Sequence, residues 1–193
     1  MARAALSPGA VVDVALAILD ERGPEALTLA AVSARAGVAT PSLYKHVRNL
    51  AELRALVSAR VIGDLADQVG EAVLGRSADD AIRALMTAWR CYVRQHPNRY
   101  LATLQSPDPR TARAGERLIG IIAAALRAYG LEDSAAVHAV RCLRAAVHGF
   151  AVLEVQGGFG LPEDADDSYD LLVRMLTAGL RAPGAVGRSG GGG

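Results

Sequence analysis

The chain has 193 residues, enough to bury a core in one medium domain or in a small head joined to a larger body. Hydrophobic residues make up 51% and charged residues 21%, which excludes an intrinsically disordered chain. The net charge of +1 excludes a strongly basic or acidic protein, and only two cysteines, Cys91 and Cys142, exclude a disulfide framework. We expect a cytoplasmic protein, because we find neither a signal peptide nor an apolar run of membrane-spanning length.

The first predicted helix begins with a capping signal. Ser7 is a good N-cap, Pro8 suits the first helical position, and Gly23 followed by proline ends the helix. Between these signals apolar residues recur at helical spacing, at Val11, Val14, Ala15, Ile18 and Leu19. This pattern predicts an amphipathic helix with one buried face.

Two short helices are predicted next. The first has Thr28 as its N-cap and runs to Ala36, where Gly37 supplies a left-handed turn. The second has Thr40 as its N-cap and Pro41 at its first position. Two short helices joined by a glycine turn are typical of a helix-turn-helix unit.

A fourth helix is predicted from the pair Asn49 and Glu52, which fits a capping box. Its inner stripe consists of Leu53, Leu56, Val57 and Val61. After Gly75 the pattern changes to longer helices, which we expect at about 77–96, 110–129, 134–156 and 166–181. The segment 98–109 is interrupted by prolines, 157–162 is a predicted loop, and 183–193 is a glycine-rich tail expected to be disordered.

The outer side of the third helix has the chemistry of a DNA-reading surface. Hydroxyl groups and small residues at its start fit a major groove, while Tyr44 and Lys45 can reach phosphates. The N-terminus of the second helix, at Thr28, is suited to a phosphate. His46 is as consistent with helix packing as with DNA contact.

The segment Leu27–Val47 resembles the tetracycline-repressor (TetR) family in its Thr-Leu opening, its Ala-Gly-Val turn and its Leu-Tyr-x-His-Val ending. The resemblance is close over residues 8–60. It implies an all-α homodimer that binds double-stranded operator DNA, with a helix-turn-helix head at 1–50 linked through the fourth helix to a bundle at 51–182 that binds a ligand and dimerises. The expected DNA-binding residues are Thr28, Ala39, Thr40, Pro41, Ser42, Tyr44, Lys45, His46 and Arg48.

One position departs from this family pattern. Members often carry a lysine at the start of the fourth helix, where it donates to a phosphate, but this chain has Leu50 there. Arg48, two residues earlier, is the candidate replacement. In the body, Trp89, the segment 148–150 and the Gly-Gly-Phe-Gly loop are similar to a family subgroup with a Trp-plus-His-Gly C-terminal domain.

The last two long helices carry apolar repeats from which we predict a dimer interface. The residues at these positions are Val140, Leu143, Val147, Phe150, Leu172, Met175, Leu176 and Gly179. Facing stretches of apolar and aromatic residues in the body also predict a pocket for a small hydrophobic effector. Its expected lining is Met86, Trp89, Tyr92, Val93, Tyr100, Leu104, Ile122, His138, Arg141 and Cys142, although an ordinary packed core fits Trp89 and Tyr92 equally well.

Other function classes find little support in the sequence. No nucleophile elbow, phosphate-binding glycine loop or catalytic dyad is present, so we expect no enzyme and no cofactor. His138 and His148 lack a paired carboxylate at ligand spacing, which argues against a metal site. The acidic residues Glu163, Asp164, Asp166 and Asp167 are interpreted as a solvated loop and helix start, where they suit the helix dipole. Cys142 is interpreted as a small core residue. The alternative function is a helical interaction protein that does not bind DNA.

Overall fold

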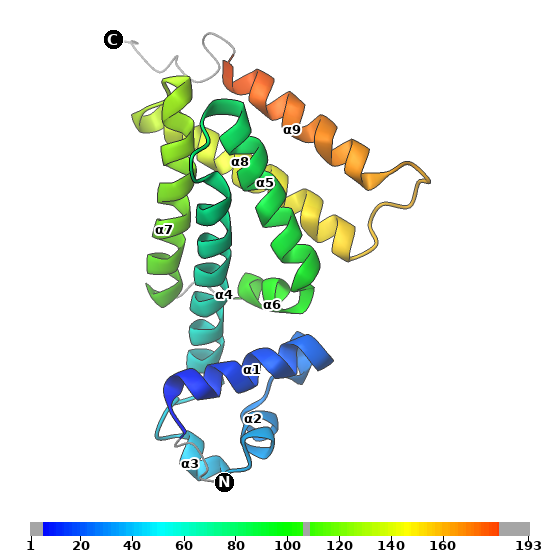
Figure 1. Ribbon diagram of the computed structural model, residues 1–193. Helices are drawn as coiled ribbons and strands as arrows, with labels where there is room; N and C mark the ends of the chain where they lie inside the picture. Colours follow the sequence, from blue (N-terminus) through cyan, green and yellow to red (C-terminus); the bar gives the residue numbers. More distant parts are fainter. Residues whose placement is uncertain (1–5, 106–108, 182–193) are drawn as a thin grey trace, which may run out of the picture. The chain divides into compact units, whose positions relative to one another are not determined.

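The computed structural model describes residues 6–105 and 109–181, and within them every regular element is a helix (Figure 1). The expected all-α fold is therefore confirmed. The predicted tail at 183–193 lies outside the described residues. The described chain forms two compact units, one extending to Asp64 and including His96–Glu116, the other comprising Leu65–Gln95 and the chain from Arg117 onward. The first unit therefore reaches beyond the head predicted at 1–50.

Unit 1 is organised by α1 (Pro8–Arg22), which contacts both α2 (Leu29–Ala36) and α6 (Pro97–Ala102). Ser7 caps α1 as predicted, since its Oγ accepts a hydrogen bond from the backbone N–H of Ala10 at 3.2 Å. The contact with α6 explains why residues far along the chain join this unit. It is reinforced by Arg99, whose Nε donates to an Asp20 carboxylate oxygen at 2.7 Å.

Two long helices contribute to both units. These are α4 (Leu50–Val73) and α7 (Pro109–Leu126), and α7 continues into a short 3-10 turn, η3 (Arg127–Tyr129). The predicted inner stripe of α4 is buried at Leu53, Val57 and Val61, whereas Leu56 is only half-buried. The remaining short elements are η1 (Pro24–Ala26), α3 (Thr40–Leu43) and η2 (Thr103–Gln105).

Unit 2 is built around α5 (Ala78–Gln95), which packs against α8 (Asp133–Val155) and α9 (Ala165–Arg181). Figure 1 shows α9 returning alongside α8 after the loop that joins them. The buried face of α5 consists mainly of apolar and aromatic side chains, namely Ala81, Ile82, Leu85, Met86, Trp89, Tyr92 and Val93.

A buried cation joins these three helices. Arg90 of α5 is only 7% exposed, and its Nε donates to a Glu154 oxygen at 2.8 Å while Nη2 lies 2.7 Å from an Asp166 oxygen. Its guanidinium carbon is 4.6 Å from the ring centroid of Tyr169 and 5.3 Å from that of Phe150. Asp166 is 69% exposed in the first turn of α9, as predicted for a solvated helix start, and it also pairs with Arg90.

The same cluster holds the loop between α8 and α9. The rings of Phe150 and Phe159 are 4.7 Å apart, and those of Phe150 and Tyr169 are 4.9 Å apart in an edge-on arrangement. The Tyr169 hydroxyl donates to the Met86 carbonyl at 2.6 Å. Burial is the main cause of a strongly raised pKa for Tyr169, so this hydroxyl stays protonated and keeps donating.

The 23 residues of α8 make it the one described helix long and apolar enough, by length and composition, to cross a membrane. The prediction that no apolar run reaches this length is therefore wrong. The helix buries one side within unit 2, from Ala139 to Ala151, and that side includes Leu143 and Val147. Its composition thus reflects in part a core helix packed against α5 and α9.

Replacing Arg90 with methionine should test this cluster, because the change removes the charge and keeps much of the apolar volume. We expect the free energy of unfolding to fall by about 3 kcal/mol, since a largely buried carboxylate loses its partner. The measurement is urea unfolding at fixed protein concentration.

The matched control is Arg94→Met, one helical turn away. The Arg94 side chain is 53% exposed and its nearest carboxylate is 3.5 Å distant, so its removal should cost less than about 1 kcal/mol. Equal losses in the two variants would contradict the role given to Arg90.

Candidate functional site

The helix-turn-helix forms from local signals in unit 1. Thr28 caps α2 as predicted, its Oγ1 accepting from the Ala31 N–H at 3.0 Å. Gly37 adopts the left-handed conformation at φ +66°, which a residue with a side chain rarely adopts. The next residue then closes the turn, because the Val38 N–H donates to the Ser33 carbonyl at 3.0 Å.

The second helix of the motif starts differently from the prediction. Its N-cap is Ala39, which has no capping side chain, and Thr40 is already the first helical residue. The prediction of Thr40 as the cap is therefore wrong. Its hydroxyl instead lies 2.9 Å from the Ser33 Oγ, so the side chain faces α2 rather than the start of its own helix.

The side chains that the resemblance assigns to DNA lie mostly on the open side of the motif. Tyr44 is 54% exposed, and Pro41 and Lys45 are exposed, while Ser42 and His46 are half-buried. The opposite side is closed by buried apolar residues, which are Val32, Leu43 and Val47. The motif thus presents an exposed, largely polar edge supported by a small core, as a DNA-reading helix requires.

The start of α4 carries the predicted cap. Asn49 Oδ1 accepts from the Glu52 N–H at 2.8 Å, while Glu52 accepts from the backbone N–H of Arg48 at 2.7 Å. Glu52 also pairs with the guanidinium groups of Arg48 and, at 2.8 Å, of Arg110. The side-chain and backbone hydrogen bonds from Arg48 lower the pKa of Glu52 to about 2, so its carboxylate is ionised near neutral pH.

The residues predicted to line an effector pocket are not brought together. Five of them are buried within unit 2, at Met86, Trp89, Tyr92, Val93 and Ile122. Tyr100 and Leu104 belong to unit 1, where Tyr100 is buried and Leu104 is 51% exposed. The three from α8, His138, Arg141 and Cys142, are exposed because the buried side of that helix lies at other positions. The interpretation of Cys142 as a core residue is wrong for the same reason.

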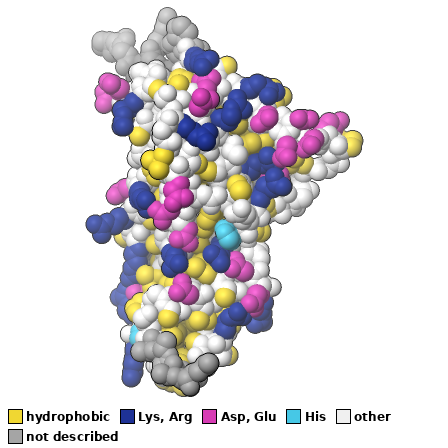
Figure 2. All heavy atoms as spheres, viewed as in Figure 1, with side chains coloured by type: hydrophobic (Ala, Val, Ile, Leu, Met, Phe, Trp, Pro, Cys, Tyr) yellow, Lys and Arg dark blue, Asp and Glu magenta, His cyan; other side chains and the backbone are white. Residues whose placement is uncertain are grey.

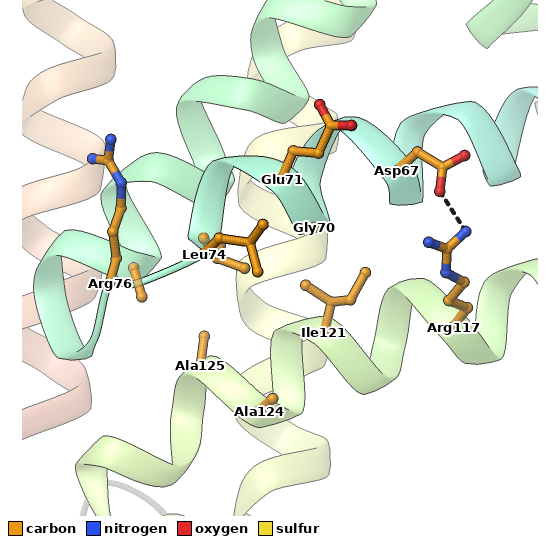
Figure 3. Close-up of a pocket in the computed structure, with 11 residues that line it drawn as sticks. Asp67, Gly70, Glu71, Leu74, Arg76, Arg117, Ile121, Ala124 and Ala125 are labelled. Atoms are coloured by element: carbon orange, nitrogen blue, oxygen red, sulfur yellow. Dashed lines mark ion pairs between the residues drawn. The ribbon is translucent and has the colours of Figure 1, made fainter.

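Unit 2 instead has a groove between the C-terminal half of α4 and α7, with a volume of about 540 Å³ (Figure 3). An ion pair between Asp67 and Arg117, at 2.5 Å, lies at one end. On the α4 side the groove is lined by Gly70, which has no side chain to occupy it. A Cβ added at Gly70 would come into contact with Ile121, 3.4 Å from its Cδ1. The complete lining is Asp67, Gly70, Glu71, Val73, Leu74, Arg76, Ala81, Arg117, Ile121, Ala124 and Ala125.

No predicted pocket residue is among the side chains that line the groove. The sequence-based prediction missed the groove because it chose Ile122 of α7 as a pocket residue, and Ile122 is buried. Its neighbour Ile121 is the residue that lines the groove. The available signal was the spacing of Arg117, Ile121 and Ala125, four residues apart on one face of α7.

The predicted dimer residues divide into two groups. On α8, Val140, Leu143 and Val147 are buried within the protomer, so they offer no surface to a second copy and that part of the prediction is wrong. Phe150 is half-buried in the aromatic cluster. On α9, Met175 is 63% exposed and Gly179 is exposed, while Leu172 and Leu176 are half-buried.

The α9 helix has one further exposed apolar residue that the prediction omitted. Leu171 is 50% exposed and precedes Met175 by four residues, so the two lie on the same open face. On α8 the outward positions include Ala145 and, half-buried, Gly149 and His148. Burial, followed by the nearby charge of Arg144, lowers the pKa of His148.

Comparisons with known proteins agree with this arrangement. Residues 11–55 match the family described as bacterial regulatory proteins, tetR family, and residues 82–176 match a tetracyclin repressor-like C-terminal domain. An uncharacterised HTH-type transcriptional regulator of Mycobacterium tuberculosis, Rv0681, is 35% identical over 181 residues, covering 92% of this chain and 83% of the relative.

The chain belongs to the TetR family of helix-turn-helix transcriptional regulators. It is therefore a DNA-binding regulator and not an enzyme, and the alternative of a DNA-independent interaction protein is not supported.

Solved structures agree with the fold over most of the chain. Apo ActR from Streptomyces coelicolor aligns with a TM-score of 0.71 at 24% identity, covering 96% of this chain and 98% of that one. FadR from Bacillus subtilis, solved in complex with stearoyl-CoA, aligns with a TM-score of 0.70 at 12% identity, covering 87% and 96%. At these identities the likeness concerns the fold alone.

Proposed function

We propose that this regulator is a cytoplasmic repressor that binds a palindromic operator as a homodimer and is released by a small, largely apolar effector. The observation that carries the proposal is the open recognition edge of unit 1, where Tyr44 and Lys45 are exposed and Thr28 caps the N-terminus of α2 in the same motif. An exposed lysine, an exposed tyrosine and a helix N-terminus are groups suited to a phosphate backbone.

Within this edge the proposed contacts fall into two kinds. Thr28, Tyr44, Lys45 and Arg48 fit phosphates, because they combine a helix N-terminus with exposed donors. Ala39, Thr40, Pro41 and Ser42 form the start of α3, whose small side chains allow close approach to base edges. His46 is half-buried and lies at the border of the edge.

A homodimer follows from the size of this edge. Four residues of α3 read few base pairs, so specificity requires a second head about one turn of DNA away. The exposed stripe of Leu171 and Met175 on α9 supports a second copy as the partner. Burying exposed apolar side chains against another protomer removes them from water, which favours association. On α8 the small residues Ala145 and Gly149, exposed and half-buried, would allow close approach of a helix from a second copy.

An effector site is supported by the groove between α4 and α7. Its volume of about 540 Å³ falls in the range of sites for small molecules. Its lining includes Gly70, Ile121 and Ala125, which favours an apolar ligand, and also Arg76, a cation that favours a ligand carrying a carboxylate or phenolate (Figure 3). The stearoyl-CoA bound to the structurally similar FadR makes acyl ligands a sensible first class to test.

The DNA prediction concerns Tyr44→Ala and Lys45→Ala. Each should weaken binding to the operator without lowering thermal stability, since both side chains are exposed. Lys45→Ala should act almost equally on all sequences and reduce the slope of log affinity against log salt by about 1, as expected for one lost phosphate contact. The measurement is a gel-shift titration on DNA upstream of the protein's own gene, at several salt concentrations.

Arg127→Ala is the control for charge, because Arg127 is exposed in unit 2 and lies outside both the recognition edge and α9. It should leave affinity and salt slope unchanged. Unaltered binding by a Tyr44→Ala, Lys45→Ala double variant would show that the recognition edge is misplaced.

The dimer prediction concerns Leu171→Arg and Met175→Arg. A charge placed on each exposed apolar residue should produce monomers at micromolar concentration while the protomer stays folded, as measured by analytical ultracentrifugation and circular dichroism. Leu104→Arg is the matched control, because Leu104 is 51% exposed, close to the 50% of Leu171, and lies in unit 1. If the α9 variants sediment as the control does, the dimer surface lies elsewhere.

The effector prediction concerns Gly70→Leu, whose side chain should fill the groove. In the unaltered protein, ligands such as decanoate, an alkylphenol or stearoyl-CoA should release the operator and change the fluorescence of Trp89, the single tryptophan. Gly70→Leu should reduce both responses while retaining DNA binding.

Gly63→Leu is the matched control, because Gly63 lies on the same helix and an added Cβ there meets nothing within 4 Å. It should respond like the unaltered protein. If both variants respond equally, the effector does not bind in this groove.

A further inference from the structure

A pair of hydroxyl groups connects the two helices of the DNA-reading motif. Ser33, on α2, is only 4% exposed, and its Oγ lies 2.9 Å from the Oγ1 of Thr40, the first residue of α3. Ser33 also donates to the carbonyl of Ala30, one turn earlier on α2, at 3.0 Å. Thr40 is half-buried at the start of α3, the helix proposed to read DNA.

The number of hydroxyl protons limits how this contact can be made. A hydroxyl group has one proton to donate and two lone pairs to accept with. By distance alone, either hydroxyl of the Ser33–Thr40 pair could donate. The contact of Ser33 with the Ala30 carbonyl uses the Ser33 proton, because a carbonyl oxygen cannot donate. While Ser33 keeps that bond, Thr40 is the donor to Ser33 and its single proton is directed inward, toward α2.

This direction restricts what Thr40 offers to DNA. With its proton directed inward, the Thr40 oxygen presents only lone pairs to the groove. Phosphate oxygens, guanine O6 and N7, and thymine O4 are all acceptors and cannot pair with it. The groups in the major groove that donate are the exocyclic amines of adenine (N6) and cytosine (N4).

We propose that Ser33 acts as a positioning residue that makes Thr40 a hydrogen-bond acceptor, so that Thr40 selects adenine or cytosine at one position of each operator half-site. The inference rests on the proposed function, because it requires α3 to lie in the major groove. Ser33 itself does not touch DNA. Its effect is to remove the donor that would let Thr40 bind guanine, thymine or phosphate equally well.

The first experiment selects binding sites from a random double-stranded DNA library with the full-length protein, Thr40→Val and Ser33→Ala. The unaltered protein should enrich a palindrome with adenine or cytosine at one position per half-site. Thr40→Val keeps the shape of the side chain but lacks the hydroxyl. Its preference for adenine or cytosine at that position should fall on the order of fivefold, the effect expected from losing one hydrogen bond. Ser33→Ala frees the Thr40 proton, so guanine and thymine should become acceptable at the same position.

Ser58→Ala is the matched control, because Ser58 is a buried serine of α4, 5% exposed, outside the two motif helices. It should select the same palindrome as the unaltered protein.

The second experiment uses only the unaltered protein, and so does not depend on any variant folding. If the selected base is adenine, the operator is synthesised with purine, which lacks the N6 amine. If it is cytosine, the operator carries 2-pyrimidinone, which lacks the N4 amine. Affinity should fall by a similar factor of about five, and Thr40→Val should show no such fall.

Two failures are distinguishable in these measurements. If the unaltered protein enriches no palindrome, the proposed operator-binding function itself fails. The unaltered protein and both variants, Thr40→Val and Ser33→Ala, could instead enrich the same palindrome with the same base preferences at every position. In that case, or if removing the amine does not change affinity, only the acceptor role of Thr40 is overturned. Loss of affinity on replacing thymine by uracil, cancelled in Thr40→Ala but not in Thr40→Val, would instead assign the contact to the threonine methyl group and also overturn the proposal.

Discussion

The arrangement of unit 2 depends on one buried cation. Arg90 is held by Glu154 and Asp166 and lies against the rings of Phe150 and Tyr169. These four partners come from α8 and α9, so a single guanidinium fixes the rotation of both helices about their axes relative to α5. A charged side chain that is only 7% exposed is tolerated where its N–H donors are paired with acceptors in this way. The need for this pairing favours one rotation of each helix over others that would bury a similar apolar area.

That rotation determines which side chains remain for partners. With Glu154 turned toward Arg90, the neighbouring positions Val147 and Ala151 must also face inward, and both are buried. Tyr169 likewise turns Val173 inward, which leaves Leu171 and Met175 on the outer face of α9. The surface proposed for a second copy is thus a consequence of the internal ion pair. Acidic side chains gather where α8 meets α9 in Figure 2, at the end of the structure that supplies Asp166.

Local signals in the sequence predicted local structure well. The caps at Ser7, Thr28 and Asn49 and the turn at Gly37 all form, because each depends on residues within four positions. Thr40 was mistaken for a cap because a threonine before Pro41 fits that role equally well in sequence. What decided its role was Ser33, a residue on another helix.

Predictions of the faces of the long helices were less successful, for a physical reason. In α8 apolar residues occur all around the helix, so periodicity cannot tell the side that meets α5 from the side left open. The choice is made by Arg90, whose pairing with a carboxylate 64 residues away has no local signature. The groove between α4 and α7 was missed for a similar reason, since it depends on Gly70 of one helix facing Ile121 of the other.

The missing lysine at Leu50 can be understood from the charges at the start of α4. Glu52 must stay ionised and in place, because its carboxylate accepts the Arg48 backbone N–H, and its pKa of about 2 ensures the charge. The Arg48 side chain, which is 77% exposed, also pairs with the Glu52 carboxylate. An ion pair this exposed contributes little to stability.

Arg110 pairs with the same carboxylate at 2.8 Å. If the Arg48 side chain turns to a phosphate, Glu52 therefore keeps a cationic partner as well as its backbone hydrogen bond. The cost of moving Arg48 is small, while a guanidinium gains a bidentate contact with phosphate. A single acid shared by two arginines thus allows one of them to supply the phosphate contact that Leu50 cannot make, which is the reason for counting Arg48 among the proposed DNA contacts.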